Sequence, residues 1–332
     1  MEKIDKTEER EISHDRISFQ MDELLSDVEQ VAIAGHVKPD GDCVGSTLAL
    51  YNYIKNNYPK IRVTLYSEPI PNLFKFLQRS DEIVSDFSED VVYDLFFSLD
   101  CGDGGRLGGA FLYFESAKKT VCVDHHISNQ SFADENYIFP EASSTSELIF
   151  ELLDKEKITK EIAECLYVGI IHDTGVFQYS CTSSRTMNIA GYLMDKGINF
   201  PEIVDKTFFE KTFEQNRIMG TALLKAERYF DDRCIACIIT AEDMKACQAL
   251  PKHLEGIVAQ LRSTKGVDIA LLIYENADGT YKVSMRTNGA VDVAAICVKY
   301  GGGGHVRAAG VTMTGDPEVI LQTLLANIKE QL

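Results

Sequence analysis

Short apolar runs recur along the first half of the chain. Three of them, VAIAG (31–35), DLFFSLD (94–100) and TVCVD (120–124), are nearly all apolar, as expected of strands that are buried on both faces. A helical pattern over 46–57 and a strand-like run at 62–66 lie between the first two. This alternation predicts an α/β fold whose first domain is a doubly wound, mostly parallel sheet.

Two further helical patterns flank these strands. The spacing of polar and apolar residues predicts an amphipathic helix over 17–29. In EIAECLYVGIIHDTGVFQYS (161–180), Ile162, Leu166 and Ile170 recur at helical spacing. The second pattern places Asp173 at the end of its helix.

The pattern changes after about residue 230. CIACIIT (234–240), VDIALLIYE (267–275) and YKVSMRT (281–287) read as short strands, and a helical pattern closes the chain at 317–330. We therefore expect a second, smaller α/β domain.

Four segments follow from these patterns. They are a polar extension over 1–22, a first domain over 23–190, a helical linker over 191–230 and a second domain over 231–332. A length of 332 residues agrees with two domains, because single cores rarely grow beyond about 250–300 residues.

Charged and imidazole side chains follow each apolar run of the first domain. His36, Asp40 and Asp42 come after the first, Asp100 ends the second, and Asp124, His125 and His126 end the third. Open parallel sheets bind ligands beyond the carboxyl ends of their strands. We expect these side chains, together with Asp173, to meet at that edge.

A simpler interpretation exists for the first of these segments. HVKPDGDCVGS (36–46) contains Pro-Asp-Gly-Asp, which is common in solvated turns. Taken alone, this segment fits a turn as well as a site. The convergence of three strand ends favours the site.

Six of these groups have the character of metal ligands: His36, Asp40, Asp42, Asp100, His125 and Asp173. Carboxylates crowded together need a cation as partner, and two divalent cations bridged by a carboxylate would satisfy them. Asp100, alone at the end of the central run, is the expected bridge. Imidazole and carboxylate ligands favour Mn²⁺ or a similar ion, and we interpret Cys43 as a space-filling neighbour.

His126 stands beside a predicted metal ligand and is available for chemistry. It could contact a phosphoryl group or protonate a leaving oxygen, so we expect His126 and Asp100 to be the catalytic residues. The alternative is a hydrogen-bonded structural histidine.

KYGGGGHVRAAG (299–310) carries the candidate chemistry of the second domain. Glycines let backbone amides approach an anion, and a helix starting near His305 would add its dipole. We expect Gly302, Gly303, Gly304 and His305, with Arg286 at the end of its strand, to bind phosphate or base. A flexible hinge is the alternative, and Arg307 fits a solvated surface residue.

The charge balance narrows the range of partners. There are 33 Lys and Arg residues against 51 Asp and Glu, a formal net charge of −18. Such a chain repels a long phosphate backbone, so a nucleic-acid substrate should be short. No apolar run reaches the roughly 20 residues of a membrane span, residues 1–16 lack a secretory signal, and nine scattered cysteines fit a reducing cytoplasm. We expect a cytoplasmic protein.

With these residues assembled, the sequence resembles the DHH phosphoesterase superfamily, in the branch with a C-terminal DHHA1 domain. The matching motifs, in family order, are HVKPDGDCVGS, SLDCGD (98–103), VDHH (123–126), HDTGVF (172–177) and GGGGHVRAAG. Within the superfamily, the two-domain length looks most like the group of bifunctional oligoribonucleases and 3′-phosphoadenosine 5′-phosphate (pAp) phosphatases. The extension before residue 20 has no match to the family pattern.

The resemblance implies a specific site. One Mn²⁺ would bind His36, Asp40 and Asp100, and the other Asp42, Asp100, His125 and Asp173. Residues matching Arg286 and the His305 segment would recognise the nucleotide across a cleft between the DHH and DHHA1 domains, and motion of 190–230 would open and close it. A homodimer also follows by analogy.

The implied reaction is hydrolysis of RNA of two to five nucleotides to mononucleotides, and of pAp to AMP. Cyclic di-AMP or its linear product pApA is the alternative substrate within the superfamily. A non-catalytic nucleotide sensor would lack a metal ligand, and a pyrophosphatase of the DHHA2 group would lack the GGGGH segment. This chain has all six predicted metal ligands and the GGGGH segment.

Overall fold

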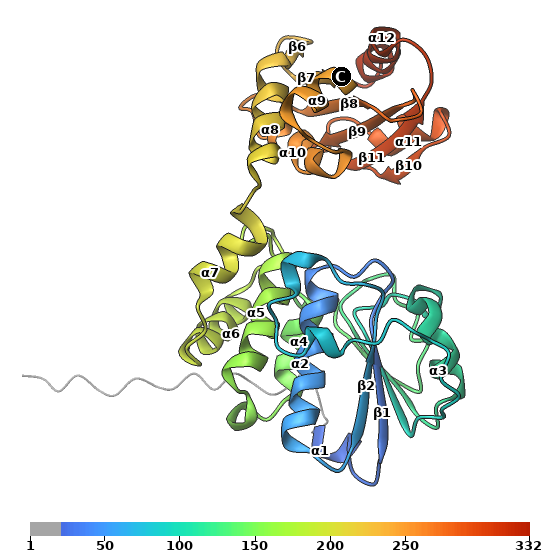
Figure 1. The fold of residues 1–332 in the computed structure, drawn as a ribbon, viewed down its shortest axis with the longest axis vertical. Coiled ribbons are helices and arrows are strands. Elements are labelled where there is room, and N and C mark those ends of the chain that lie inside the picture. The colour runs from blue at the N-terminus through green and yellow to red at the C-terminus, as the bar shows by residue number, and fades with distance from the viewer. Residues whose placement is uncertain (1–20) are drawn as a thin grey trace, which may run out of the picture. The chain divides into compact units, whose positions relative to one another are not determined.

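The computed structural model describes residues 21–332. The chain divides into two compact units, with the boundary between Glu210 and Lys211 (Figure 1). This boundary falls within the predicted linker over 191–230. The predicted extension over 1–22 and the first residues of the helix predicted at 17–29 lie outside the described residues. The predicted cleft and linker motion stay predictions.

The first unit is built on a parallel sheet of five strands in the order β2-β1-β3-β4-β5. The strands are β1 (Gln30–Ala34), β2 (Arg62–Tyr66), β3 (Leu95–Leu99), β4 (Thr120–Asp124) and β5 (Glu135–Ile138). All three nearly apolar runs and the strand-like run at 62–66 therefore form the predicted strands. β5 was not predicted.

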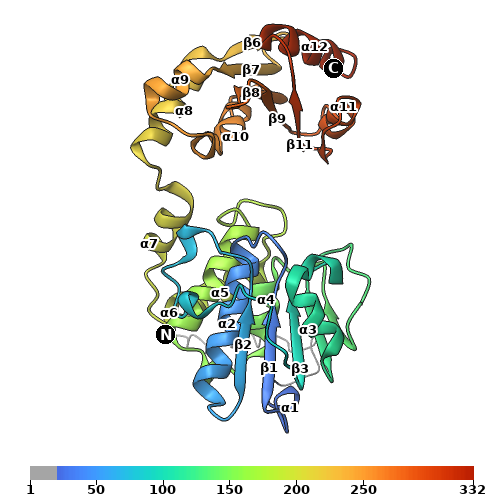
Figure 2. The ribbon, with the colours of Figure 1, turned by 45° about the vertical axis from the view of Figure 1, so that its right-hand side comes forward.

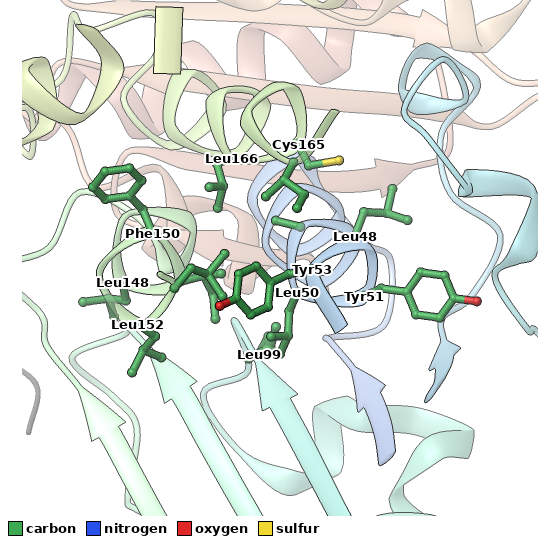
Figure 3. Packing of buried hydrophobic residues seen from close by; sticks show 14 of the residues in the cluster. Leu48, Leu50, Tyr51, Tyr53, Leu99, Leu148, Phe150, Leu152, Cys165 and Leu166 are labelled. Atoms are coloured by element: carbon green, nitrogen blue, oxygen red, sulfur yellow. The ribbon is translucent and has the colours of Figure 1, made fainter. Parts of the chain in front are cut away.

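Helices cover both faces of this sheet (Figure 2). Buried side chains of α2, α4 and α5 pack with Leu95, Phe97 and Leu99 on one face, whereas Phe96 packs with α3 on the other. Figure 3 shows Leu48, Leu148 and Leu166 within the first of these clusters. The doubly wound fold is confirmed.

The helices of this unit are mostly short. They are α1 (Met21–Leu24), α2 (Gly41–Asn57), α3 (Phe111–Ser116), α4 (Thr145–Leu152), α5 (Lys160–Asp173), α6 (Ser184–Asp195) and α7 (Phe200–Val204). Shorter turns are η1 (Asn72–Phe74), η2 (Ser80–Glu82), η3 (Gly104–Ala110), η4 (Lys155–Lys157) and the π-helical turn η5 (Asp205–Phe209).

Two helix boundaries differ from the prediction. α2 begins at Gly41 rather than 46, because the Asp40 carboxylate caps it by accepting the N–H groups of Asp42 and Cys43. α1 ends at Leu24 rather than 29. The Asp94 carboxylate accepts the N–H groups of Glu29 and Gln30 at 2.9 Å each, which holds that segment at the start of β1.

The second unit contains a mixed sheet of six strands in the order β10-β11-β9-β8-β7-β6. Its strands are β6 (Glu227–Tyr229), β7 (Cys234–Ile239), β8 (Ile269–Glu275), β9 (Tyr281–Thr287), β10 (Gly303–His305) and β11 (Ala308–Met313). β7 and β8 are parallel and the other pairs antiparallel. The predicted second α/β domain is confirmed.

Helices also pack on both faces of the second sheet. α8 (Phe213–Lys225), α9 (Ala241–Cys247) and α10 (Ile257–Arg262) share one buried cluster with β7 and β8, and α11 (Val293–Lys299) and α12 (Pro317–Lys329) share the other. The turn η6 (Pro251–Leu254) precedes α10. None of the helices in the described part of the chain combines the length and apolar character needed to cross a membrane.

Candidate metal centre

The carboxyl edge of the first sheet gathers all six predicted ligands. His36 follows β1, Asp40 and Asp42 lie at the start of α2, Asp100 follows β3, His125 follows β4, and Asp173 is the last residue of α5. Each of these side chains lies within 4.0 Å of at least one other member of the set. The parallel sheet and the two helices therefore assemble one cluster from distant parts of the sequence.

Asp100 occupies the centre of this cluster. Its Oδ2 lies 3.5 Å from Nε2 of His36, and its Oδ1 lies 3.6 Å from Nε2 of His125. β3 is the middle strand of the sheet, and Asp100 adopts a left-handed conformation with φ +55°, which aspartate tolerates better than most residues. One carboxylate thus faces two imidazoles.

The His36 side of the cluster includes Asp40. Nε2 of His36 lies 3.6 Å from Oδ1 of Asp40, while Nδ1 lies 2.9 Å from the carbonyl oxygen of Val37. The carbonyl can only accept, so we assign the proton to Nδ1. Nε2 is then the ring nitrogen that faces the two carboxylates.

The His125 side of the cluster includes two further carboxylates. Nε2 of His125 lies 2.9 Å from Oδ2 of Asp173 and 4.0 Å from Oδ2 of Asp42. The six groups therefore sort into two sets that share only Asp100.

The electrostatics of the cluster call for added positive charge. Burial, followed by repulsion from Asp100 and Asp173, raises the pKa of Asp42 well above its usual range. Burial lowers the pKa of His36 and of His125, but hydrogen bonds to Asp100 and Asp173 respectively outweigh it and raise each pKa to about 10. Imidazole and carboxylate donors in this arrangement fit divalent cations, which would relieve the repulsion.

The N-terminus of α4 holds one carboxylate in place, a feature that the sequence interpretation missed. The backbone N–H groups of Thr145 and Ser146 donate to Asp42 at 2.6 and 2.9 Å, and the Thr145 hydroxyl donates to Asp100 Oδ1 at 3.1 Å. Helix N-termini favour negative charge. The spacing Ser144-x-x-Glu147, a common start signal for helices, could have revealed α4.

The role of Asp124, which orients His126, was also missed, although the residue itself was expected at this edge. The Asp124 carboxylate is fully buried, lies 2.7 Å from His126 Nδ1, and accepts the Asn129 amide at 2.7 Å. Its hydrogen bond raises the pKa of His126. The His126 side chain is 35 % exposed and its Nδ1 lies 3.7 Å from Asp100 Oδ1, so its ring borders both the cluster and solvent.

Among the described residues, three groups of side chains could hold a metal ion. They are Asp42, His125 and Asp173; Asp100, His125 and His126; and His36, Cys43 and Asp100. Cys43, which we interpreted as a space-filling neighbour, therefore lies close enough to His36 and Asp100 to share a metal ion with them.

The glycine-rich segment of the second unit forms a hairpin rather than the start of a helix. β10 pairs antiparallel with β11 through a two-residue turn. Gly304 has φ +144°, and a Cβ there would lie 2.5 Å from the carbonyl oxygen of Ala308, so the glycine permits close pairing. The prediction of a helix near His305 is wrong, because this backbone pairs with a strand. Gly302 precedes β10, and Gly303, Gly304 and His305 are exposed.

Arg286 lies on β9, two strands from β10 in the same sheet. Its backbone pairs with Ala308 of β11, and Ser284 pairs with Gly310. Lys282, Ser284 and Arg286 are half-buried, whereas Val283 and Met285 between them are buried. One face of this hairpin region thus carries two cations beside small residues.

The chain matches two protein families along its length. Residues 30–170 match the DHH family, N-terminal domain, and residues 244–332 match the DHHA1 domain. The first match covers the five-strand sheet and five of the six residues of the metal-ligand cluster, ending three residues before Asp173, and the second covers the glycine hairpin.

Curated relatives resemble the chain over most of its length. The bifunctional oligoribonuclease and PAP phosphatase NrnA of Thermus thermophilus is 28 % identical, and the match covers 93 % of each chain. The protein of the same name from Bacillus subtilis is 25 % identical over 87 % of this chain and 91 % of its own. The cyclic-di-AMP phosphodiesterase PdeA of Listeria monocytogenes is 29 % identical over 90 % of this chain but 47 % of its own.

A solved structure shares the fold. An exopolyphosphatase-related protein from Bacteroides fragilis superposes with a TM-score of 0.80 at 26 % identity, covering 92 % of this chain and 93 % of that one.

Proposed function

Because the chain belongs to the DHH phosphoesterase superfamily and carries its DHHA1 domain, we propose that it is a metal-dependent phosphoesterase. Its substrates are RNA oligonucleotides of about two to five nucleotides, a length that suits an acidic protein, and pAp, which it converts to AMP. The observation that carries this proposal is the Asp100 carboxylate, whose two oxygens face His36 and His125 separately.

Two divalent cations, most simply Mn²⁺, would occupy the cluster. His36, Asp40 and Asp100 would hold one ion, and Asp42, Asp100, His125 and Asp173 the other. Bound divalent cations lower the pKa of water and neutralise charge on phosphoryl oxygens. The imidazole and carboxylate donor set supports Mn²⁺.

His126 is the proposed proton donor in the reaction. The buried Asp124 carboxylate holds Nδ1 of His126, which directs the other ring nitrogen away from Asp124. A protonated His126 can donate to a phosphoryl or leaving oxygen as the P–O bond breaks. The carboxylate that raises its pKa keeps this proton available near neutral pH.

The second unit supplies the proposed nucleotide contacts. Arg286 offers planar N–H donors for phosphate or base, and Gly302, Gly303, Gly304 and His305 lie at or beside the exposed strand β10. These contacts suit a small anionic substrate, in agreement with the net charge of −18. Cytoplasmic localisation and a homodimer complete the proposal, and light scattering of the purified protein tests the dimer.

The test is a substrate panel with Mn²⁺. Purified protein is incubated with pAp, 5′-labelled diribonucleotides, RNA of about 24 nucleotides, pApA and cyclic di-AMP, a range chosen because long chains demand more cationic contacts. We expect mononucleotides from the short RNA and AMP from pAp, with far slower cleavage of the long RNA. Asp100→Ala should be inert, and Glu89→Gln, an exposed acidic residue away from the cluster, should match the parent.

The alternative substrate is cyclic di-AMP or pApA, which the similarity to PdeA supports. If the protein cleaves cyclic di-AMP but not pAp or diribonucleotides, the assignment of short RNA and pAp as substrates is wrong and the cyclic dinucleotide takes their place. Hydrolysis by Asp100→Ala within tenfold of the parent would refute the bridging role of Asp100.

A further inference from the structure

Cys43 lies inside the metal-ligand cluster rather than beside it. It belongs to the first turn of α2, between the helix start and the core, and its N–H donates to the Asp40 carboxylate at 3.2 Å. Its side chain is 2 % exposed. The thiol therefore has a fixed position, set by the same helix turn that places Asp40 and Asp42.

The thiol sulfur lies close enough to His36 and Asp100 for the three residues to bind one metal ion. One ligand atom each from His36, Cys43 and Asp100 lie within 4.8 Å of one another, and Sγ lies 3.8 Å from the His36 carbonyl oxygen. A Cβ at Gly35 would overlap Sγ, so the glycine provides the space that the thiol occupies. Asp40 lies 3.6 Å from His36 on the same side of the cluster.

We propose that Cys43 is a fourth ligand for soft divalent cations at the position of His36, Asp40 and Asp100, and that it determines which metals support activity. This inference rests on the proposed metal centre. Zn²⁺ and Cd²⁺ accept thiolate ligands, whereas Mn²⁺ prefers oxygen and imidazole donors. On binding a soft ion, the thiol releases its proton to solvent and the sulfur forms the metal bond.

The consequence is a closed site for the soft ions. His36, Cys43 and Asp100 would supply one nitrogen, one sulfur and one oxygen donor, and Asp40, beside His36, would supply a fourth. Structural zinc sites with four protein ligands leave no position for water or substrate. A Mn²⁺ ion at the same place would leave the sulfur unbound and keep open positions. Zn²⁺ and Cd²⁺ are therefore expected to bind tightly and to inhibit.

The test measures Cd²⁺ binding through thiolate-to-metal charge-transfer absorption in the ultraviolet. All proteins carry Cys181→Ser, because Cys181 is an exposed thiol. Cys43→Ser and Cys43→Ala are compared with the background protein and with Cys101→Ala, a matched control. Cys101 is equally buried and follows Asp100 directly, but belongs to none of the three ligand groups found among the described residues.

We expect one charge-transfer band that saturates with Cd²⁺ in the background protein and in Cys101→Ala, and that both Cys43 variants lack. Cd²⁺ affinity should fall by at least about 10- to 100-fold in Cys43→Ser, because the loss of a residue that only orients a metal ligand already costs that much. Mn²⁺ affinity should be unchanged in Cys43→Ser, and Zn²⁺ should inhibit that variant less.

A band that persists without Cys43, or Cd²⁺ bound to the background protein without a band, overturns the inference. In either case normal Mn²⁺ binding and hydrolysis would leave the proposed function standing. Failure of the background protein to bind Mn²⁺ and Cd²⁺ alike would instead remove the metal centre and both proposals.

Discussion

Asp124 controls the imidazole of His126 through one buried hydrogen bond of 2.7 Å. The carboxylate also accepts the Asn129 amide and the His125 N–H, so its position is fixed from three sides. Such a group orients a neighbouring histidine and stabilises its charged form. Its effect should therefore appear in the rate and pH dependence of hydrolysis rather than in substrate affinity.

Asp124→Asn is expected to lower kcat by about 10- to 100-fold with little change in KM. An uncharged amide no longer raises the pKa of His126, so the alkaline loss of activity should move to lower pH. The measurement is the pH profile of kcat. Asp134→Asn is the control, because Asp134 accepts the Thr120 N–H at the opposite end of β4. An unmoved profile in Asp124→Asn would contradict the role assigned to Asp124.

His172 is a half-buried neutral histidine next to the proposed ligand Asp173. Its ring lies between Phe74 and Phe208, with ring centroids 5.0 and 4.4 Å away, and its Nε2 has no hydrogen-bond partner among the described residues. Burial lowers the pKa of His172 to about 4. Below pH 6.5 the unfolded chain binds a proton at this residue that the folded protein does not bind until about pH 4.

His172 should therefore cost stability as the pH falls from 6.5 to 4, by about 3 kcal/mol. His172→Phe removes this cost, so the metal-free variant should lose less unfolding free energy than the parent across that range. Urea unfolding at several pH values with chelator present measures the difference, in which the other histidines cancel. His253→Gln is the control. Parallel curves for parent and His172→Phe would show that His172 does not titrate as described.

At the scale of elements, close packing of α2 against α5 sets the position of Asp42. Gly45 of α2 faces the backbone of α5, where a Cβ would lie 2.5 Å from the Cys165 carbonyl oxygen. Gly169 of α5 faces Asp42, and a Cβ there would lie 2.6 Å from Asp42 Oδ1 and overlap the Ser146 hydroxyl. The two glycines let the helices approach and leave space for the carboxylate.

Gly169→Ala should destabilise the first unit by about 1–3 kcal/mol, because the added methyl group overpacks this contact. It should also weaken Mn²⁺ binding by displacing Asp42. Urea unfolding and Mn²⁺ titration measure the two effects. Gly191→Ala is the matched control in α6, where a Cβ would meet no atom within 4 Å, and it should be neutral or stabilising by up to about 1 kcal/mol. Equal behaviour of the two variants would contradict the packing argument.

The sequence predicted the elements whose signal is local. β1, β3 and β4 are apolar on both faces, and the polar residues that end them meet because parallel strands share one carboxyl edge. β5 is a short edge strand with mixed burial, so it has no such pattern. The hairpin of β10 and β11 was missed because consecutive glycines suit a strand pair, a hinge or a helix start equally well.

The missed parts of the site depend on contacts between distant residues. Asp124 was assigned only to a strand end, and its pairing with His126 required the geometry of the loop that follows β4. The hydrogen bonds from Thr145 and Ser146 to Asp42 span more than 100 positions in sequence. Cys43 is adjacent to Asp42 in sequence, but the direction of its thiol depends on where α2 begins.

At the scale of the whole molecule, the negative charge of the protein opposes binding of the negatively charged substrate that we propose. A net charge of −18 repels phosphate, and four carboxylates at one sheet edge add to this locally. Two divalent cations would cancel the charge of those four carboxylates at that edge alone. Short substrates that contact the centre and a few cationic residues then become acceptable, while long nucleic acids remain repelled.

The central claim is that these six side chains hold two cations bridged by Asp100. Electron paramagnetic resonance of Mn²⁺-titrated protein tests it directly, because two ions that share a carboxylate couple magnetically and are counted in the same titration. We expect two Mn²⁺ per chain with a coupled signal in the parent, and loss of the coupled signal in a folded Asp100→Ala variant. A single uncoupled ion in the parent, or a coupled pair that survives in Asp100→Ala, would contradict the account.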